Sequence, residues 1–438
     1  MEKGSARVVR ESFGERLMPA VVLTVGDELL IGQVVNSNAA WLGEQLSLAG
    51  VELVRTVTVG DELGVIKSEL GRALSDSDLV IVTGGLGPTH DDLTREAIAE
   101  YFGVQLEFHP EIYDAIKRRF DARRRSMPES NRAQAMVPAG FHVLENPAGT
   151  APGLWNVVRV DGRDCMMAVL PGVPHEMKSL YTHEVLPRVL ERKDLRIIEH
   201  RTLLTAGIGE SHLQEKIGDL SGFLSPEVRL AYLPGPSGVR LRLTVMGRAR
   251  EEVRSRLDGF ERRLRHRVEA FIYGSGDVTL EEVVGKMLVE RRLTVAVAES
   301  CTGGCVANRI TNVPGSSTYM LGGVVAYSNW VKIGLLGVVA EVLETEGAVS
   351  ESVARHMAEG VRRHLKADIG LSTTGVAGPT GGTLDKPVGT VWIAYSDEQG
   401  TDAVLLNLVN DRILNKELTA TALLNYVRRR LAEGPAPQ

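Results

Sequence analysis

Between Val21 and Thr83 the hydrophobic residues form short runs that alternate with longer amphipathic stretches. Short apolar runs bounded by glycine or polar residues predict strands, and apolar residues repeating every three or four positions predict helices. The predicted strands and helices alternate in the order Val21–Val25, Asn38–Ala49, Glu52–Val59, Asp61–Ser75 and Asp78–Thr83, and a further helix ends near Tyr101. This alternation is typical of an α/β domain with a parallel sheet and helices on both faces.

Polar and glycine-rich loops follow the predicted strands at 26–28, 60–62 and 84–92. In such sheets ligands bind beyond the carboxyl ends of the strands, so these loops predict a ligand site. Two stretches rich in proline and glycine, 146–153 and 170–174, mark the predicted C-terminal end of this domain.

The next region has the pattern of a smaller α+β domain. Arg201–Ala206 predicts a strand, Glu210–Gly218 a helix, and the Pro-Gly-Pro-Ser-Gly stretch at 234–238 a hairpin turn. The long predicted helix Glu251–Ala270 carries six arginines interleaved with acidic residues. We interpret it as a solvated surface rather than a nucleic-acid-binding face.

From about Val278 the α/β pattern returns, with a helix at Leu280–Glu290, a strand at Thr294–Ala298 and a helix at Cys301–Asn312. We therefore predict a flexible extension at 1–17 and domains at 18–175, 176–276 and 277–434.

The composition narrows the class of protein. At 438 residues the chain is long enough for two to four domains. Its net charge of −6 argues against general nucleic-acid binding. No apolar run is long enough to span a bilayer, and the N-terminus lacks a signal-like apolar core. Three cysteines provide no disulfide framework. We expect a cytoplasmic protein that contacts neither membrane nor nucleic acid.

A serine, Ser300, falls at the turn between a predicted buried strand and a helix that opens with Gly303-Gly304. Such a turn can expose a nucleophile beside free backbone N–H groups, but Ser300 or Thr302 could equally cap the helix. Residues 277–434 resemble the C-terminal domain of the CinA family, a nicotinamide-nucleotide amidase. The matching stretches are 298–304, 322–329 with Lys332, 347–350, 374–379 and 386–391.

The resemblance implies that Ser300 is the nucleophile and that Tyr327 and Lys332 activate it. A desolvated lysine can act as the base without a histidine. The implied reaction is deamidation of nicotinamide mononucleotide, and it needs no cofactor. The residues expected to bind the substrate or its oxyanion are Thr302, Gly303, Gly304, Gly375, Ala377, Gly378 and Arg412. Arg412 is the expected phosphate clamp, although Asn410 replaces a family glycine nearby and leaves that loop's conformation open.

Residues 26–29, 83–94 and 170–174 resemble the molybdopterin-binding fold, a three-layer domain that CinA proteins carry at their N-terminus. In some relatives this domain is a metal-dependent ADP-ribose pyrophosphatase. The expected substrate contacts are Gly26, Gly84, Gly85, Gly87 and Thr150. The expected ligands of Mg²⁺ or a similar divalent ion are Asp61, Asp91 and Asp92, with Asp27 and Glu28 as second candidates. Asp61 and Asp92 could instead cap helices.

The middle region looks KH-like but lacks a Gly-x-x-Gly loop, which argues against RNA binding. We therefore expect a bifunctional hydrolase that acts on nicotinamide mononucleotide and ADP-ribose, and we expect a homodimer. Two alternatives remain: a molybdopterin-binding type of protein, and a competence-associated interaction protein with one or both sites inactive.

Overall fold

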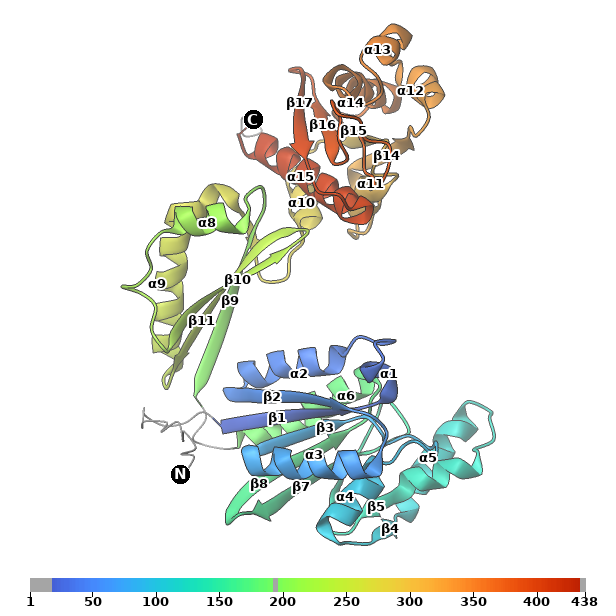
Figure 1. The fold of residues 1–438 in the computed structure, drawn as a ribbon, viewed down its shortest axis with the longest axis vertical. Helices are drawn as coiled ribbons and strands as arrows, with labels where there is room; N and C mark the ends of the chain where they lie inside the picture. The colour runs from blue at the N-terminus through green and yellow to red at the C-terminus, as the bar shows by residue number, and fades with distance from the viewer. Residues whose placement is uncertain (1–17, 192–195, 434–438) are drawn as a thin grey trace, which may run out of the picture. The chain divides into compact units, whose positions relative to one another are not determined.

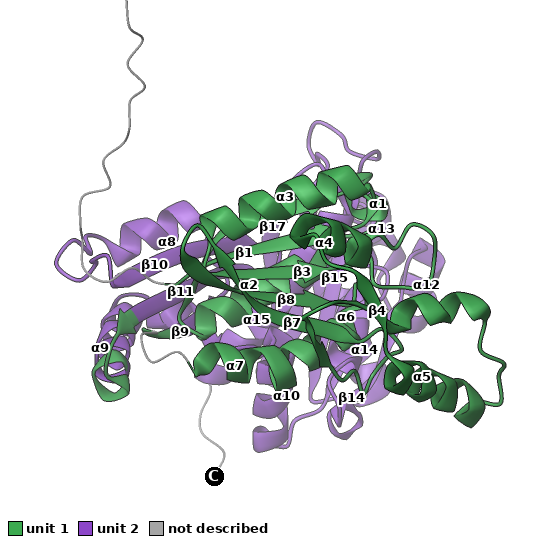
Figure 2. Cartoon of the chain, turned by 90° about the horizontal axis from the view of Figure 1, so that it is seen from below, with its two compact units in different colours: residues 1–199, 246–253 green, residues 200–245, 254–438 purple. Residues whose placement is uncertain are grey.

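The computed structural model describes residues 18–191 and 196–433. The chain divides into two compact units, one of residues 1–199 with 246–253 and one of 200–245 with 254–438 (Figure 2). The predicted flexible extension at 1–17 lies outside the described residues.

The N-terminal unit is built on a six-stranded sheet with the order β2-β1-β3-β8-β7-β6. Its strands are β1 (Met18–Val25), β2 (Val51–Val59), β3 (Leu79–Thr83), β6 (His142–Leu144), β7 (Gly153–Val160) and β8 (Arg163–Leu170). The first four in the order are parallel, whereas β7 runs antiparallel to both of its neighbours, β8 and β6. The parallel sheet predicted from the alternating strands and helices is confirmed for β1, β2 and β3. The sequence analysis did not predict the antiparallel hairpin of β7 and β8, in which Asp161 and Gly162 both have positive φ and form a tight turn.

Helices cover both faces of this sheet and make three layers (Figure 1). One core lies under α3 (Leu63–Asp76), α4 (Thr94–Phe102) and α5 (Pro110–Ala122), and the other under α2 (Ser37–Leu48), α6 (Pro174–Leu180) and α7 (Leu186–Leu190). Along β1, Val21 and Leu23 enter the first core and Ala20 and Val22 the second. Burial on both faces explains why the strand reads as one continuous apolar run. The smaller elements are α1 (Asp27–Leu30), β4 (Leu106–Phe108) and β5 (Met136–Pro138).

The N-terminal unit extends past the predicted boundary at residue 175. Met177, Leu180, Tyr181, Val185 and Val189 are buried in its second core. The Pro-rich segment at 170–174 is therefore a loop inside the domain, and the boundary was placed too early because proline and glycine mark turns as well as linkers.

The middle region is an α+β arrangement with the sheet order β10-β11-β9-β12. Its elements are β9 (Ile197–Thr205), α8 (Glu210–Ile217), β10 (Val228–Gly235), β11 (Gly238–Gly247), α9 (Arg250–Val268) and β12 (Ile272–Ser275). The predicted hairpin is confirmed by the pairing of β10 with β11. On α9, Arg256 and Arg265 form ion pairs with glutamates, and Arg201 of β9 pairs with Asp258 of the helix.

The C-terminal region is a three-layer α/β domain with the sheet order β14-β13-β15-β16-β17. The strands are β13 (Val295–Glu299), β14 (Met320–Val325), β15 (Ile369–Gly375), β16 (Thr390–Ser396) and β17 (Thr401–Asn407), of which the first three are parallel. One face carries α10 (Leu280–Arg291), α11 (Cys305–Thr311) and α15 (Arg412–Glu433). The other carries α12 (Asn329–Leu336), α13 (Ala340–Thr345) and α14 (Glu351–Leu365).

One predicted helix begins later than expected. Gly303 and Gly304 have φ values of 60° and 97°, so residues 301–304 form a turn and α11 starts only at Cys305. In the part of the chain that the structure describes, no helix is both long and apolar enough to cross a membrane.

Candidate active sites

Ser300 lies at the carboxyl end of β13, in a turn fixed by backbone hydrogen bonds. Its N–H donates to the carbonyl of Thr373 on β15 over 2.9 Å, and the N–H of Gly303 donates to the Ser300 carbonyl over 3.1 Å. The left-handed conformation of Gly303, which glycine adopts at little cost, closes this turn. The serine is therefore held at the edge of the sheet where parallel α/β proteins bind ligands.

Lys332 reaches Ser300 from α12. Its Nζ lies 3.3 Å from Ser300 Oγ and donates to the carbonyls of Ala326, over 2.7 Å, and Tyr327, over 3.4 Å. The side chain is only 1% exposed. Burial disfavours the ammonium form and lowers the pKa of Lys332 from its usual 10.5. A lysine with a lowered pKa at this distance from a hydroxyl can accept the hydroxyl proton.

Tyr327 and Arg412 form a second pair at the same site. The Tyr327 hydroxyl accepts a hydrogen bond from Arg412 over 2.9 Å, and Arg412 also donates to the Gly378 carbonyl over 2.7 Å. Tyr327 meets Lys332 through its backbone carbonyl, and within the described residues its hydroxyl bonds to neither Lys332 nor Ser300. The Tyr327 ring is 61% exposed, and its expected part in activating Ser300 stays a prediction.

Glu299 is a site residue that sequence reasoning missed. It is 1% exposed, and its carboxylate accepts hydrogen bonds from the N–H groups of Gly304, Val306 and Ala307 over 2.8–3.1 Å. A carboxylate at a helix N-terminus satisfies free N–H groups and interacts favourably with the helix dipole. An acidic residue at the end of a buried strand, directly before the serine, was the available signal.

This cap changes the roles expected for the turn. The N–H of Gly304 is bonded to Glu299 and that of Gly303 to the Ser300 carbonyl, so neither is free to bind an oxyanion as predicted. Thr302 is fully buried, and its hydroxyl hydrogen-bonds to that of Thr373 over 2.6 Å. Thr302 therefore holds the turn against β15 and does not face a substrate.

The glycines after β15 also have packing roles. A Cβ on Gly375 would collide with Val391 and the Thr390 carbonyl, and one on Gly378 would collide with Val388. The Ala377 carbonyl accepts a hydrogen bond from the buried Asn415 over 3.0 Å. Packing alone therefore explains why glycine stands at 375 and 378, without the predicted close approach of a ribose phosphate. Of these residues, Gly378 is linked to the site, because its carbonyl accepts a hydrogen bond from Arg412.

In the N-terminal unit, a cavity of about 470 Å³ opens at the carboxyl ends of β1, β3 and β8. All the predicted substrate contacts line it: Gly26, Gly84, Gly85, Gly87 and Thr150. As at Gly375 and Gly378, packing requires glycine at two of these positions, because a Cβ on Gly84 would collide with the Val25 carbonyl and one on Gly85 with the Thr94 side chain. The buried Arg95 holds the glycine turn from behind through the carbonyls of Leu86 and Gly87.

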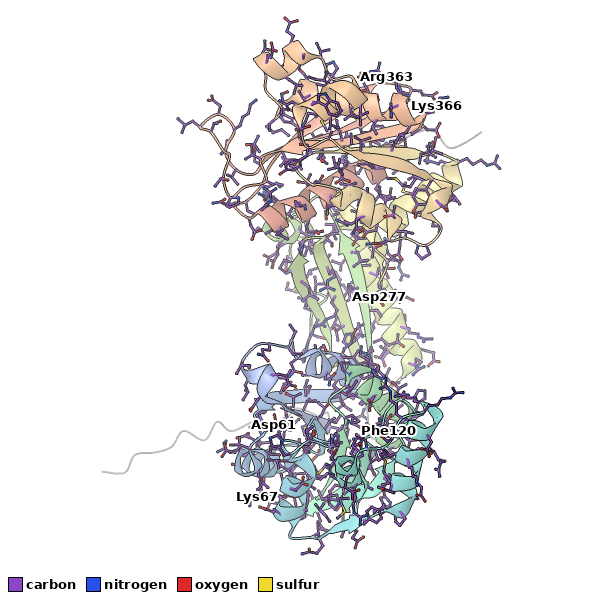
Figure 3. The ribbon with its side chains drawn as sticks, turned by 90° about the vertical axis from the view of Figure 1, so that its right-hand side faces the viewer. Asp61, Lys67, Phe120, Asp277, Arg363 and Lys366 are labelled. Atoms are coloured by element: carbon purple, nitrogen blue, oxygen red, sulfur yellow. The ribbon has the colours of Figure 1, made fainter. Side chains whose placement is uncertain are left out.

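Carboxylates form one wall of this cavity. Glu28, Asp61, Asp91 and Asp92 line it, and Asp61 is labelled in Figure 3. Asp27 is tied to Asp61, because the carboxylate of each accepts the N–H of the other, over 2.9 and 3.3 Å. Burial, assisted by the negative charges of Asp27, Glu28 and Asp91, raises the pKa of Asp61 above its usual 3.8.

Asp92 differs from the other predicted metal ligands. One of its oxygens accepts the N–H of Gly87 over 2.7 Å, and the other accepts the N–H and hydroxyl of Thr89. Both oxygens of Asp92 are thus used to hold the turn that follows β3. This is a structural role, in place of the predicted role as a metal ligand.

The carboxylates around the N-terminal cavity are candidate ligands for a divalent cation. Within residues 18–191 and 196–433, no three His, Cys, Asp or Glu side chains are placed to hold a metal ion by themselves. Mg²⁺, however, is usually bound by only one or two carboxylates together with substrate phosphates and water. Asp61 and Asp91, which line the cavity, fit binding by two carboxylates together with substrate phosphates. A cation between them would also relieve the repulsion between their negative charges.

The loop at 146–150 is a second feature that the sequence did not reveal. Asn146 Oδ1 accepts the N–H groups of Ala148 and Gly149, each over 3.0 Å, and Arg119 of α5 donates to the carbonyls of Asn146, Pro147 and Gly149. Asn146 also donates to Glu176 at the cavity wall over 2.7 Å. These contacts order the loop that leads to Thr150, which the resemblance already gave as an expected substrate contact.

The fold and these sites define a three-domain α/β protein with a molybdopterin-binding-like first domain, a KH-like middle domain and a C-terminal α/β domain. The molybdopterin-binding domain family matches residues 21–191, the KH domain of damage-inducible protein CinA matches 200–274, and the CinA C-terminal domain matches 277–431. The chain belongs to the CinA family.

Two relatives that align over nearly the whole chain support this assignment, and a solved structure resembles part of it. A CinA-like protein of Salinibacter ruber is 52% identical over 95% of this chain and all of its own length. A putative competence-damage inducible protein of Halothermothrix orenii is 41% identical over 94% of this chain and 99% of its own. A crystal structure of CinA from Thermoplasma acidophilum is 36% identical and covers 40% of this chain and 98% of its own, with a TM-score of 0.36.

Proposed function

We propose that the C-terminal domain is an amidase that deamidates nicotinamide mononucleotide. The observation that carries the proposal is the 3.3 Å approach of a fully buried lysine amine, Lys332 Nζ, to Ser300 Oγ. Membership of the CinA family supports the choice of substrate, through the amidase resemblance of residues 277–434.

In the first half of the reaction, neutral Lys332 takes the proton of Ser300 as Oγ attacks the carboxamide carbon. The C–O bond forms, and the tetrahedral intermediate then expels the amide nitrogen, which leaves as ammonia with the proton returned by Lys332. In the second half, Lys332 deprotonates a water that attacks the acyl-enzyme ester. The carboxylate product, nicotinate mononucleotide, leaves, and Ser300 regains its proton.

Arg412 and Tyr327 bind rather than react. The guanidinium is anchored to the Gly378 carbonyl and the Tyr327 hydroxyl and has further N–H groups that can bind an anionic group of the substrate. The exposed Tyr327 ring supplies a flat surface for a pyridine ring.

The test is ammonia release from nicotinamide mononucleotide by the purified chain and by Ser300→Ala. We expect kcat to fall by a factor on the order of 10⁴ or more, because the nucleophile is removed. The matched control is Ser352→Ala, which removes a partly exposed hydroxyl of α14 whose partner is Glu346 and should leave the rate unchanged. Full activity in Ser300→Ala would reject Ser300 as the nucleophile, and an inactive parent would reject the amidase itself.

We also infer a second activity, hydrolysis of ADP-ribose to AMP and ribose 5-phosphate in the N-terminal unit. It is favoured by the 470 Å³ cavity that combines a glycine turn with the carboxylates of Asp61 and Asp91. A divalent cation, when bound, neutralises diphosphate charge and activates a water. The chain's own residues hold the diphosphate against the glycine turn, with Asp61 and Asp91 as the carboxylates nearest such an ion.

A further inference from the structure

A cavity of about 600 Å³ lies at the end of the C-terminal sheet opposite to Ser300. Leu293 and Ile369, the first residue of β15, line it, whereas Ser300 follows the last residue of β13. Because β13 and β15 run parallel, the cavity and the serine lie at opposite ends of the same two strands. Small-molecule sites have volumes of roughly 300–1,000 Å³, so this cavity is large enough for a second ligand.

The walls of this cavity combine apolar and cationic side chains. Ile369, Tyr395 and Leu431 line it and are buried. Three arginines near the ends of α10, α14 and α15 also line it: Arg291, Arg362 and Arg430. Apolar walls with a few polar groups are typical of small-molecule sites, and arginine favours ligands that carry a carboxylate or a phosphate.

Arg362 differs from Arg430 in its partners. Arg430 donates to Asp402 over 2.9 Å, and its guanidinium carbon lies 5.3 Å from the centre of the Tyr395 ring. The Nε of Arg362 is buried and, within the part of the chain that the structure describes, has no hydrogen-bond partner. A partly buried guanidinium with an unpaired N–H group is unfavourable, and an anion in the cavity would compensate for its charge.

The acidic side chains of the cavity are used elsewhere or lie on its exposed side. Asp368 accepts the N–H and the hydroxyl of Thr294 over 2.8 and 2.6 Å. Asp397 accepts two backbone N–H groups of the turn between β16 and β17. Glu398 and Glu433 are exposed to solvent, which screens their charge. The guanidinium of Arg362 is therefore the cationic group of the cavity wall that best suits a bound anion.

We propose that this cavity is a second ligand site of the C-terminal domain, for a small molecule that carries a carboxylate or phosphate group on an apolar body. Arg362 binds the anionic group, because guanidinium N–H groups pair with the oxygens of either. The apolar body packs against Ile369 and Leu431. The site is separate from the Ser300 site and does not depend on the amidase function proposed above.

The test measures binding of phenyl phosphate and benzoate to the full chain by calorimetry, in the parent and in Arg362→Met. We expect Arg362→Met to weaken binding of the preferred anion about 10- to 100-fold, the range of a charge-assisted hydrogen bond. The anion that binds more tightly identifies the group as phosphate or carboxylate. Benzyl alcohol, which has the ring without the charge, should bind parent and variant equally. Arg412→Met should keep the Arg362-dependent binding, because Arg412 belongs to the Ser300 site.

Arg363→Met is the matched control. It removes the same charge from the next position of α14, which is exposed and does not line the cavity, and it should leave binding unchanged (Figure 3). Without ligand, Arg362→Met should melt no lower than the parent, because it removes a buried donor that has no partner. Absence of binding to the parent, equal affinity in Arg362→Met, or an equal loss in Arg363→Met would each overturn the site.

Discussion

At the scale of single residues, Lys332 shows how burial changes chemistry. A lysine on a helix surface is an ammonium ion at neutral pH, with no lone pair to accept a proton. Here the side chain is 1% exposed and its partners are two carbonyls and a hydroxyl. Since these partners only partly replace water, the neutral amine gains relative to the ammonium and the pKa falls.

The lowered pKa predicts the pH dependence of ammonia release. Because only the neutral amine accepts the Ser300 proton, kcat/KM should rise with pH through the lowered pKa of Lys332 and level off below 10.5. Lys332→Met should reduce kcat by about 10²- to 10⁴-fold. A rate–pH profile of parent and variant measures both, and a parent rate that is flat over the range below 10.5 would contradict the role of Lys332 as the base.

The same shift has a consequence for stability. Between the folded pKa of Lys332 and its ordinary 10.5, the unfolded chain binds the extra proton, so this residue makes the folded state more stable as pH rises through that window. At neutral pH burial of the charge is therefore a cost that Lys332→Met removes. The variant should melt no lower than the parent, which separates loss of the base from loss of the fold.

At the scale of elements, the N–H groups at the N-terminus of α11 have a different partner in the structure from the one that the sequence predicts. The sequence showed a serine, two glycines and a helix, which fits an oxyanion site. The structure instead brings the Glu299 carboxylate to the N–H groups of Gly304, Val306 and Ala307. A strand residue directs alternate side chains to opposite faces, but which face meets the start of the next helix depends on how the turn closes. That closure is set by Gly303 and Gly304 in three dimensions.

Glu299→Gln should destabilise the C-terminal domain by about 1–3 kcal/mol, because it replaces charge-assisted hydrogen bonds with weaker ones and removes a favourable charge from the helix N-terminus. Urea unfolding measures this change. Glu344→Gln on the exposed surface of α13 is the matched control and should be neutral. An unchanged free energy of unfolding in Glu299→Gln would show that the cap is not a stabilising contact.

At the scale of the whole molecule, the two proposed sites belong to different compact units. At the Ser300 site the buried Lys332 amine lies beside the serine hydroxyl, whereas the N-terminal cavity is lined by carboxylates that include Asp61 and Asp91. The two reactions should therefore respond differently to metal removal.

Treatment with EDTA should abolish ADP-ribose hydrolysis and leave ammonia release from nicotinamide mononucleotide unchanged, and added Mg²⁺ should restore the first rate. Asp61→Asn should have the same selective effect, since it removes a carboxylate that an ion needs. In the parent, the raised pKa of Asp61 predicts that ADP-ribose hydrolysis falls with decreasing pH before the usual 3.8 is reached. Loss of both activities on EDTA treatment would contradict separate chemistries.

The sequence alone determined the alternation of strands and helices and the hairpin of the middle domain, because both follow from local periodicity and turn residues, which are properties of neighbouring positions. The resemblance to the CinA family singled out Ser300, Lys332 and Arg412 as candidate site residues. Tertiary structure decided the antiparallel pairing of β7 and β6, the assignment of residues 176–190 to the N-terminal core and the hydrogen bonds of Glu299 and Asp92. Each depends on which distant groups meet, and hydrogen-bond satisfaction and desolvation act only once those groups are brought together.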